Sequence, residues 1–326
     1  MKAVVLTEFG SPDVLKCVNV DMPSIAGNEV LIRVVATSVN FADIKSRYGK
    51  KDSGKLPFIP GLDAAGVIEA VGSDVQKFKV GQRVIAFPKT GSYAEYIVAD
   101  EVLTFAIPDN VDFDTAAACP IVSFTAYKLL ADVARVEPGE TVLIHAAAGG
   151  VGTTAIQLAK LLGAGCVIGT VGSEAKVAIA VEAGADHAIC YENGDFAERV
   201  NALTNGRGAD VILDSISGRV SEQSLECFAM YGRLVHFGNS SGEIGDFQTN
   251  HLHSSCRSVL GFSWGTTRRE RPHLLHTTAE HILRYLASGR LKMKIGKQFA
   301  LEQAAEAHRW VESRQSVGKV LLTVEN

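Results

Sequence analysis

The sequence is poor in the patterns that bind metals or cross-link a chain. Its six cysteines are scattered, and no two form a Cys-x-x-Cys pair. Zinc sites need several closely placed His, Cys or carboxylate ligands, so the spacing predicts reduced core thiols and no metal. One local group, His251, His253 and Cys256, does have metal-binding side chains. We interpret it as a loop or strand with polar side chains.

Long apolar runs and a strong charge of one sign are also missing. No stretch reaches the roughly 18 apolar residues of a membrane-spanning helix, and the run Met1 to Leu6 is too short for a signal peptide. The net charge of −4 argues against a nucleic-acid binder, which would usually be basic. The basic run 268–271 is interrupted by Glu270 and favours a solvated helix end or loop. We therefore expect a cytoplasmic protein with neither a membrane nor a nucleic-acid partner.

Two kinds of pattern divide the 326 residues, a length that exceeds the roughly 150-residue prior for one domain. Up to about residue 120, short β runs alternate with proline and glycine, which indicates a compact, barrel-like β domain. These runs are 29–36, 65–71, 82–87 and 93–98.

From about residue 140 to residue 262, apolar runs alternate with helical stretches. The expected strands are 141–145, 166–170, 188–190, 210–213, 233–237 and 258–262, and the expected helices are 153–162, 174–182, 195–204 and 221–230. Apolar runs linked by helices are typical of a parallel sheet covered on both faces. Six strands in this order predict a doubly wound nucleotide-binding domain.

The tail returns to a mixed pattern. The spacing of Thr277 and Glu280 predicts a capping box before a helix that ends near Gly289. A second helix is expected over 303–312 and a last strand over 319–324. This order favours one domain inserted within another, with the tail rejoining the first.

A glycine loop follows the expected strand 141–145. Ala147 holds the first position of a Gly-x-Gly-x-x-Gly pattern, and Gly149 and Gly152 hold the second and third. Gly149 lets the backbone approach a pyrophosphate, and Gly152 lets the helix pack closely on the strand. The helix N-terminus offers N–H groups and a positive dipole end to the anion. The motif predicts a dinucleotide site.

The end of the second strand indicates which dinucleotide binds. Domains that prefer NAD place Asp or Glu there, but in residues 169–176 no carboxylate ends the strand. Ser173 and Lys176 could donate to a 2′-phosphate, whereas Glu174 is placed to serve the helix N-terminus. These residues favour NADPH.

These motifs and several further blocks resemble the quinone oxidoreductase branch, zeta-crystallin-like, of the zinc-free medium-chain dehydrogenases and reductases. The similarity runs along nearly the whole chain and includes residues 39–43, 60–66, 145–152, 169–176, 214–215 and 237–242. It implies an α/β fold in which a Rossmann domain with a doubly wound parallel sheet is inserted in a β-rich GroES-like catalytic domain. The active site would lie in the cleft between the two domains. The catalytic domain would comprise residues 1–122 and 265–326, and the NADP(H)-binding domain residues 123–264.

The resemblance also implies where the site residues lie. Asn40, Asp43 and Thr125 would lie on the catalytic side, near the nicotinamide. The implied cofactor-binding residues are Phe41, Lys45, Thr125, Gly149, Gly150, Val151, Gly152, Gly172, Ser173, Lys176, Tyr191, Ser215, Phe237, Gly238, Asn239, Ser240, Phe262, Ser263, Trp264 and Arg314. A homodimer joined through the last Rossmann strand, 258–262, is implied as well.

The zinc-dependent relatives carry a Gly-His-Glu motif, which here reads Gly61, Leu62 and Asp63. Without a Lewis acid, direct hydride transfer suits an acceptor that is already electron-poor, such as a quinone or an enone. The candidate hydrogen-bond donors to the developing oxyanion are Asn40, Lys45, Arg47, Tyr48 and Thr125. Tyr48 is the preferred donor because of its place in the segment 40–49.

The expected activity is NADPH-dependent reduction of a quinone. An enone or alkenal reductase would share the fold and the cofactor. A low-activity NADPH-binding sensor or RNA-associated protein is a second alternative, and a scaffold that keeps only the nucleotide fold is a third.

Overall fold

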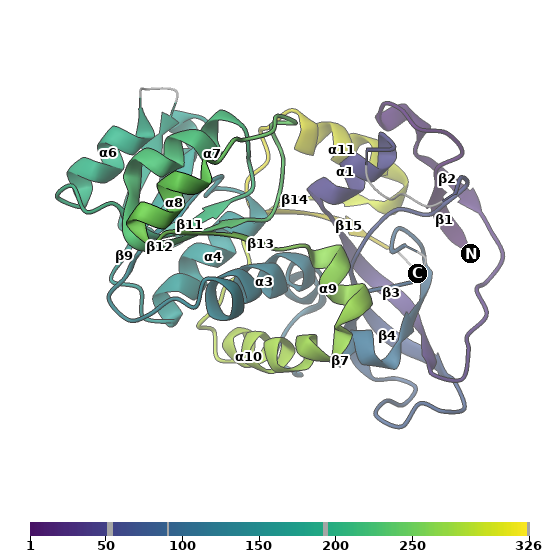
Figure 1. The fold of residues 1–326 in the computed structure, drawn as a ribbon. Coiled ribbons are helices and arrows are strands. Elements are labelled where there is room, and N and C mark those ends of the chain that lie inside the picture. Colours follow the sequence, from purple (N-terminus) through teal and green to yellow (C-terminus); the bar gives the residue numbers. More distant parts are fainter. Residues whose placement is uncertain (51–54, 90, 192–194, 325–326) are drawn as a thin grey trace. The chain divides into compact units, whose positions relative to one another are not determined.

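The computed structural model describes residues 1–50, 55–89, 91–191 and 195–324 (Figure 1). The chain divides into two compact units. Unit 1 comprises residues 1–124 and 268–326, and unit 2 comprises residues 125–267. Within the described ranges, no helix is long and apolar enough to cross a membrane.

Unit 2 is built on a six-stranded sheet in which every neighbouring pair of strands is parallel. The strand order is β10-β9-β8-β11-β12-β13. The strands are β8 (Thr141–Ile144), β9 (Cys166–Val171), β10 (His187–Cys190), β11 (Ala209–Asp214), β12 (Phe228–His236) and β13 (Ser258–Gly261). The order confirms the predicted doubly wound sheet. It reverses between β8 and β11, the place where such sheets bind their ligands.

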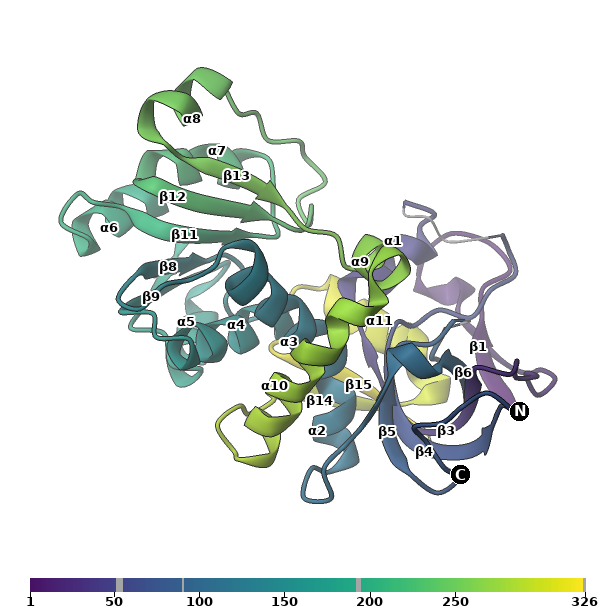
Figure 2. The same cartoon turned by 60° about the horizontal axis from the view of Figure 1, so that its bottom comes forward.

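Helices cover both faces of this sheet (Figure 2). Helices α4 (Gly150–Leu161) and α5 (Val177–Glu182) lie on one face, and α6 (Phe196–Leu203) and α7 (Arg219–Ser224) lie on the other. A π-helix (Lys128–Val133) follows α3 (Pro120–Tyr127), and short 3-10 turns cover Glu174–Lys176 and Leu225–Cys227. Because each crossover helix shields one face, the strands carry apolar residues on both.

Two predictions for unit 2 are wrong in part. The helix expected over 221–230 ends early, and β12 already begins at Phe228, which pairs with Ala209 of β11. The group expected in a loop or strand, His251 to Cys256, instead forms helix α8 (Thr249–Ser255) with Cys256 as its C-cap. No residue of α8 is buried, so its sequence lacks the apolar period that reveals a helix.

Unit 1 contains a mainly antiparallel sheet in the order β14-β15-β3-β4-β5-β7, with β6 paired to β3. Its strands are β3 (Glu29–Val39), β4 (Ala64–Val71), β5 (Arg83–Ala86), β6 (Tyr96–Asp100), β7 (Thr104–Ala106), β14 (Ile295–Ala300) and β15 (Lys319–Thr323). Strands β1 (Lys2–Val5) and β2 (Lys16–Asn19) form a separate pair. Because β15 pairs with β3, the tail of the chain rejoins the first segment, as expected.

Helices and short turns complete unit 1. The helices are α1 (Phe41–Arg47), α2 (Phe113–Ala118), the first part of α3, the end of α9 (Trp264–Glu270), α10 (Leu275–Ala287) and α11 (Ala304–Glu312). The 3-10 turns are Pro12–Val14, Glu101–Leu103, Pro272–Leu274 and Leu301–Gln303. The capping box predicted at Thr277 is wrong, because α10 begins at Leu275, whose buried side chain opens the apolar face one turn earlier than expected.

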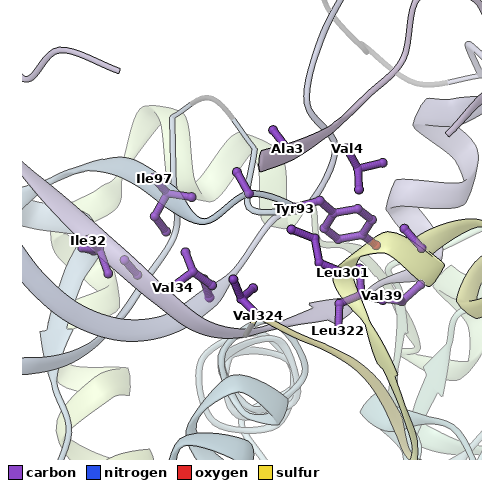
Figure 3. Packing of buried hydrophobic residues seen from close by; sticks show 14 of the residues in the cluster. Ala3, Val4, Ile32, Val34, Val39, Tyr93, Ile97, Leu301, Leu322 and Val324 are labelled. Carbon is purple, nitrogen blue, oxygen red and sulfur yellow. The ribbon is translucent and has the colours of Figure 1, made fainter. Parts of the chain in front are cut away.

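The core of unit 1 joins the two ends of the chain (Figure 3). Ala3 and Val4 of β1 belong to one buried cluster with Leu322 of β15 and Leu301. The ring of Tyr93 lies among these apolar side chains, and its hydroxyl group hydrogen-bonds to Asp43 and His308. The tail is therefore part of the hydrophobic core that supports β3 and the helix that follows it, α1.

Candidate functional site

The glycine loop joins β8 to α4 where the strand order of unit 2 reverses. Gly149 is the N-cap residue of α4. A Cβ on Gly152 would lie 2.4 Å from the carbonyl oxygen of Ala146 and 2.6 Å from the Cα of Ala147, so the close approach requires glycine. The first amides of a helix have no acceptor within the helix, and residues 150–152 supply them here. This geometry fits a pyrophosphate bound at the helix N-terminus.

His145 fastens the start of this loop to the neighbouring elements. Its Nε2 lies 2.9 Å from the hydroxyl oxygen of Ser224, and its Nδ1 lies 2.8 Å from that of Thr170. Because Ser224 donates its proton to the carbonyl of Val220, His145 must donate from Nε2 and accept at Nδ1. Burial lowers the pKa of His145 to about 4, so the ring stays neutral near pH 7. This histidine therefore holds the loop in place.

Asp214 holds the turn that follows β11. Its carboxylate is fully buried and accepts the amide of Ile216 at 2.8 Å and that of Ser217 at 3.1 Å. It also accepts the hydroxyl of Ser221. The Nδ1 of His236, at the end of β12, lies 3.7 Å from the same carboxylate. These contacts fix the turn that carries the predicted cofactor residue Ser215.

The structure brings together the residues predicted to bind the adenosine end of the cofactor. Strand β9 ends at Val171 without a carboxylate, and Ser173 is the N-cap of the turn that contains Lys176. A Cβ on Gly172 would lie 2.8 Å from the hydroxyl oxygen of Tyr191, so the phenol group lies against this glycine. A serine hydroxyl, a lysine and a phenol hydroxyl thus gather at the end of β9, and all three can donate to a phosphate.

The loops after β11 and β12 lie against each other. A Cβ on Gly238 would lie 2.9 Å from the carbonyl oxygen of Ser215, and the amide of Ser240 donates to the same oxygen at 3.0 Å. The side chain of Asn239 accepts the amide of Gly242 at 2.7 Å. The predicted residues Phe237, Phe262, Ser263 and Trp264 continue the chain from β12 and β13. Their contact with a cofactor stays a prediction.

The remaining predicted residues lie on α1, on α3 and after α11. Phe41 and Tyr48 are 45% and 41% exposed, and Lys45 lies over the ring of Phe41 at 5.5 Å. Thr125 is buried in α3. Arg314 is exposed beyond the end of α11.

A chain of buried hydrogen bonds supports α1 from within unit 1. The guanidinium of Arg47 donates to Nδ1 of His308 at 3.0 Å, so Nε2 of this ring carries its proton and donates to the hydroxyl oxygen of Tyr93, 3.1 Å away. Tyr93 in turn donates to the carboxylate of Asp43 at 3.2 Å. Burial, reinforced by Arg47, lowers the pKa of His308 to about 3, which agrees with this neutral tautomer. Every donor in the chain points toward Asp43.

This arrangement shows how two predicted residues of α1 are placed. The side chain of Arg47, a candidate donor to the oxyanion, is fully buried and paired with Glu312 at 2.7 Å. Asp43 is also buried, and it accepts the amide of Asn40 at 2.8 Å at the start of α1. Both side chains therefore support the helix within unit 1, and the roles predicted for them at the reaction site stay predictions.

The polar residues that the fold gathers next to α1 could not be assigned a role from the sequence. Asp63 belongs to a motif that lacks a metal ligand, and no site role is predicted for Tyr93, His308 or Lys319. One signal was present: Lys319 and His308 each interrupt an apolar segment, and all four side chains are buried. Buried charged groups are rare unless they are paired.

Metal-binding groups are not gathered anywhere in the described part of the chain. No three His, Cys, Asp or Glu side chains there lie close enough to hold an ion. Each of the six cysteines is a free thiol.

Gly152→Ala should disrupt the glycine loop. The added Cβ would meet backbone atoms that cannot turn aside, so we expect a stability loss of about 1–3 kcal/mol and a large loss of dinucleotide affinity. Urea unfolding and calorimetric titration with NADPH measure both. Gly265→Ala is the control, since its Cβ would have no atom within 4 Å; equal behaviour of the two variants would contradict the close approach.

Asp43→Asn should change how stability depends on pH. Burial raises the pKa of Asp43 from 3.8 to about 7, although the amide of Asn40 opposes the shift. Folding thus favours the protonated carboxyl, and the wild type loses stability as pH rises from about 4 to about 7. The Tm of the variant minus that of the wild type should therefore rise between about pH 5.5 and about pH 8.5. Asp21→Asn, at an exposed position, is the control, and a constant difference for Asp43→Asn would contradict the argument.

Comparison with known proteins identifies the family. Residues 26–109 match the family described as alcohol dehydrogenase GroES-like domain, and residues 150–280 match the family described as zinc-binding dehydrogenase. Among curated proteins, quinone oxidoreductase of Pseudomonas aeruginosa is 37% identical over 98% of this chain and 99% of its own. Synaptic vesicle membrane protein VAT-1 homolog of Danio rerio is 32% identical over 99% of this chain and 70% of its own.

A solved structure agrees with this result. Escherichia coli quinone oxidoreductase complexed with NADPH superposes with a TM-score of 0.93 at 33% identity and covers 99% of this chain and 100% of the other. The GroES-like β domain and the inserted Rossmann domain expected from the sequence are thereby confirmed. The chain belongs to the quinone oxidoreductase branch of the medium-chain dehydrogenases and reductases.

Proposed function

We propose that the protein is an NADPH-dependent reductase that passes a hydride to a quinone without a metal. The observation that carries this proposal is the end of β9, where Ser173, Lys176 and Tyr191 gather and no carboxylate ends the strand. The curated relative from P. aeruginosa is named a quinone oxidoreductase, and the solved relative from E. coli was complexed with NADPH.

The residues of unit 2 fit this cofactor. The amides of residues 150–152 would hold the pyrophosphate at the N-terminus of α4. Ser173, Lys176 and Tyr191 would donate to the 2′-phosphate. The loop 237–240 packs against Ser215 and donates a hydrogen bond to its carbonyl. This loop would line the cofactor beyond the pyrophosphate.

The reaction needs an electron-poor acceptor and an oriented donor. Bound NADPH supplies a hydride, and a quinone or enone can take it because its oxygen stabilises the negative charge that develops. We propose Tyr48 as the hydrogen-bond donor to this oxygen, because its side chain is exposed and the guanidinium of Arg47 lies 4.4 Å from its ring centroid. Asn40 and Asp43 act by holding α1, and Thr125 acts from α3.

The donor set of unit 1 supports a reaction without zinc. A catalytic zinc takes three protein ligands, and Leu62 stands where the zinc-dependent relatives carry histidine. The neighbouring carboxylate of Asp63 is already occupied by hydrogen bonds from Ser38, Asn40 and Ile121.

A homodimer through β13 and a cytoplasmic location complete the proposal. Strand β13 is the edge of the unit 2 sheet, and Met230 and Tyr231 of the adjacent β12 are 73% and 74% exposed. A second copy could pair with this edge and cover these side chains. The molar mass in solution, measured by light scattering, decides between monomer and dimer.

The test of the activity is the loss of nicotinamide absorbance with the purified protein. We expect faster oxidation of NADPH than of NADH with a small quinone, unchanged by a chelator. Tyr48→Phe should lower kcat/KM by at least about tenfold, and an unchanged value would remove Tyr48 from the chemistry.

Turnover with an enone alone would make the protein a double-bond reductase. Tight NADPH binding without turnover would favour a sensor, and loss of activity with the chelator would contradict the zinc-free mechanism.

Lys176→Ala should separate the two cofactors. Loss of a charged hydrogen bond to the 2′-phosphate would weaken NADPH binding by about tenfold to a hundredfold and leave NADH binding unchanged. Lys160→Ala is the matched control, because Lys160 is a lysine of the same unit at the end of α4 that pairs with Asp186. Calorimetric titration measures both affinities, and an equal loss for NADPH and NADH would refute the phosphate contact.

A further inference from the structure

The carboxylate of Asp63 binds three separate elements of unit 1. It is fully buried and immediately precedes β4. One oxygen accepts the hydroxyl of Ser38 at 2.7 Å and the side-chain amide of Asn40 at 3.0 Å. The other accepts the backbone amide of Ile121 at 3.0 Å. The donors come from the end of β3, the N-cap of α1 and the first turn of α3.

Lys319 completes the arrangement from the tail of the chain. This side chain is 3% exposed at the start of β15, and its Nζ donates to the side-chain oxygen of Asn40 at 2.7 Å and to the carbonyl of Val39 at 3.1 Å. Asn40 is thus held at both ends of its amide group, by a cation at the oxygen and by a carboxylate at the nitrogen. The orientation of this amide is fixed by charge.

The two helices joined in this way carry the groups assigned to the reaction. Helix α1 bears Lys45 and Tyr48, and its first residue follows Asn40. Helix α3 bears Thr125, one turn after Ile121. A shift of either helix would move these groups relative to an acceptor.

We propose that Asp63 and Lys319 are positioning residues that couple α1 to the first turn of α3 and so hold α1, with Tyr48 at its end, in place for the reaction. This inference rests on the proposed function, because it takes the role of Tyr48 from there. It assigns a task to two buried charges that touch neither an acceptor nor a cofactor in the proposed arrangement.

Removing one charge alone would leave the other buried without its partner and could unfold the protein. The double variant Asp63→Asn/Lys319→Met avoids this, because asparagine keeps the shape of the aspartate and methionine the length of the lysine stem. The charges of Asp43 and Arg268, which interact electrostatically with this pair, stay in place.

The first measurement is hydrogen–deuterium exchange of the protein without cofactor. We expect exchange to accelerate by about tenfold or more, as for the loss of a charged hydrogen bond, in the peptides covering 40–47 and 121–124 together. Glu29→Gln is the matched control, since Glu29 is another buried carboxylate of unit 1, which accepts the amide of Ala26 and pairs with Lys89. In Glu29→Gln, hydrogen–deuterium exchange should accelerate near residue 26 but not in α1 or α3. No acceleration, or acceleration in one helix only, would overturn the coupling.

The second measurement is NADPH oxidation in a single turnover with excess acceptor. We expect the rate per folded molecule to fall at least about tenfold, while the Kd for NADPH changes less than about twofold because its phosphate contacts are assigned to unit 2. The single variant Lys319→Arg keeps both charges, so its rate should lie between those of the double variant and the wild type. A double variant with the wild-type rate would overturn the positioning role, whatever its Tm.

A milder variant keeps the proposal testable if the double variant does not fold. Ser38→Ala removes one donor to Asp63 and no charge, and it should change exchange and rate in the same directions by a smaller factor. Unchanged values in Ser38→Ala would then overturn the proposal. If the wild type itself oxidises no NADPH with either acceptor, the proposed function fails, and the exchange measurement still decides the coupling.

Discussion

A buried carboxylate that must be satisfied by the protein itself shapes both candidate sites. Asp63 in unit 1 and Asp214 in unit 2 have no exposed surface, so each needs hydrogen-bond donors from within the protein. Asp63 accepts hydrogen bonds from residues of β3, of α3 and of the N-cap of α1. Asp214 accepts hydrogen bonds from the turn after β11 and from α7. Each carboxylate lies at one end of a strand, where the sheet gives way to the segments that carry the predicted site residues. The hydrogen bonds to these carboxylates hold those segments in place.

The second constraint is steric and concerns the approach of α4 to β8. The space at Gly152 is filled by the backbone of Ala146 and Ala147, and this contact sets where the first amides of α4 stand. His145, kept neutral by burial, fastens the same loop to Thr170 and Ser224. A rigid loop loses little freedom when it binds an anion, which favours affinity. In the proposed function this loop would hold a pyrophosphate, and the donors at the end of β9 would bind a 2′-phosphate.

What could be predicted from the sequence depends on the range of the interactions. The parallel sheet and the glycine loop follow from local period and spacing, and the strand order agrees with them. The early start of β12 at Phe228 could not be seen, because its pairing with Ala209 of β11 decides it, and α8 lacks an apolar face. The polar network under α1 was missed for the same reason: Lys319 lies 279 residues from Asn40 along the chain. The roles predicted for single residues of the cofactor site stay predictions, although the structure gathers many of them at the ends of β9, β11 and β12.

We propose that this protein transfers hydride directly from NADPH to an electron-poor acceptor. The most direct measurement follows deuterium from the C4 position of the nicotinamide, using metal-depleted protein and an enone, whose product keeps a carbon-bound label. With NADPH deuterated on the transferred face, we expect deuterium at the β-carbon of the reduced product. Label that appears only in solvent, or transfer that requires added zinc, would contradict the proposal.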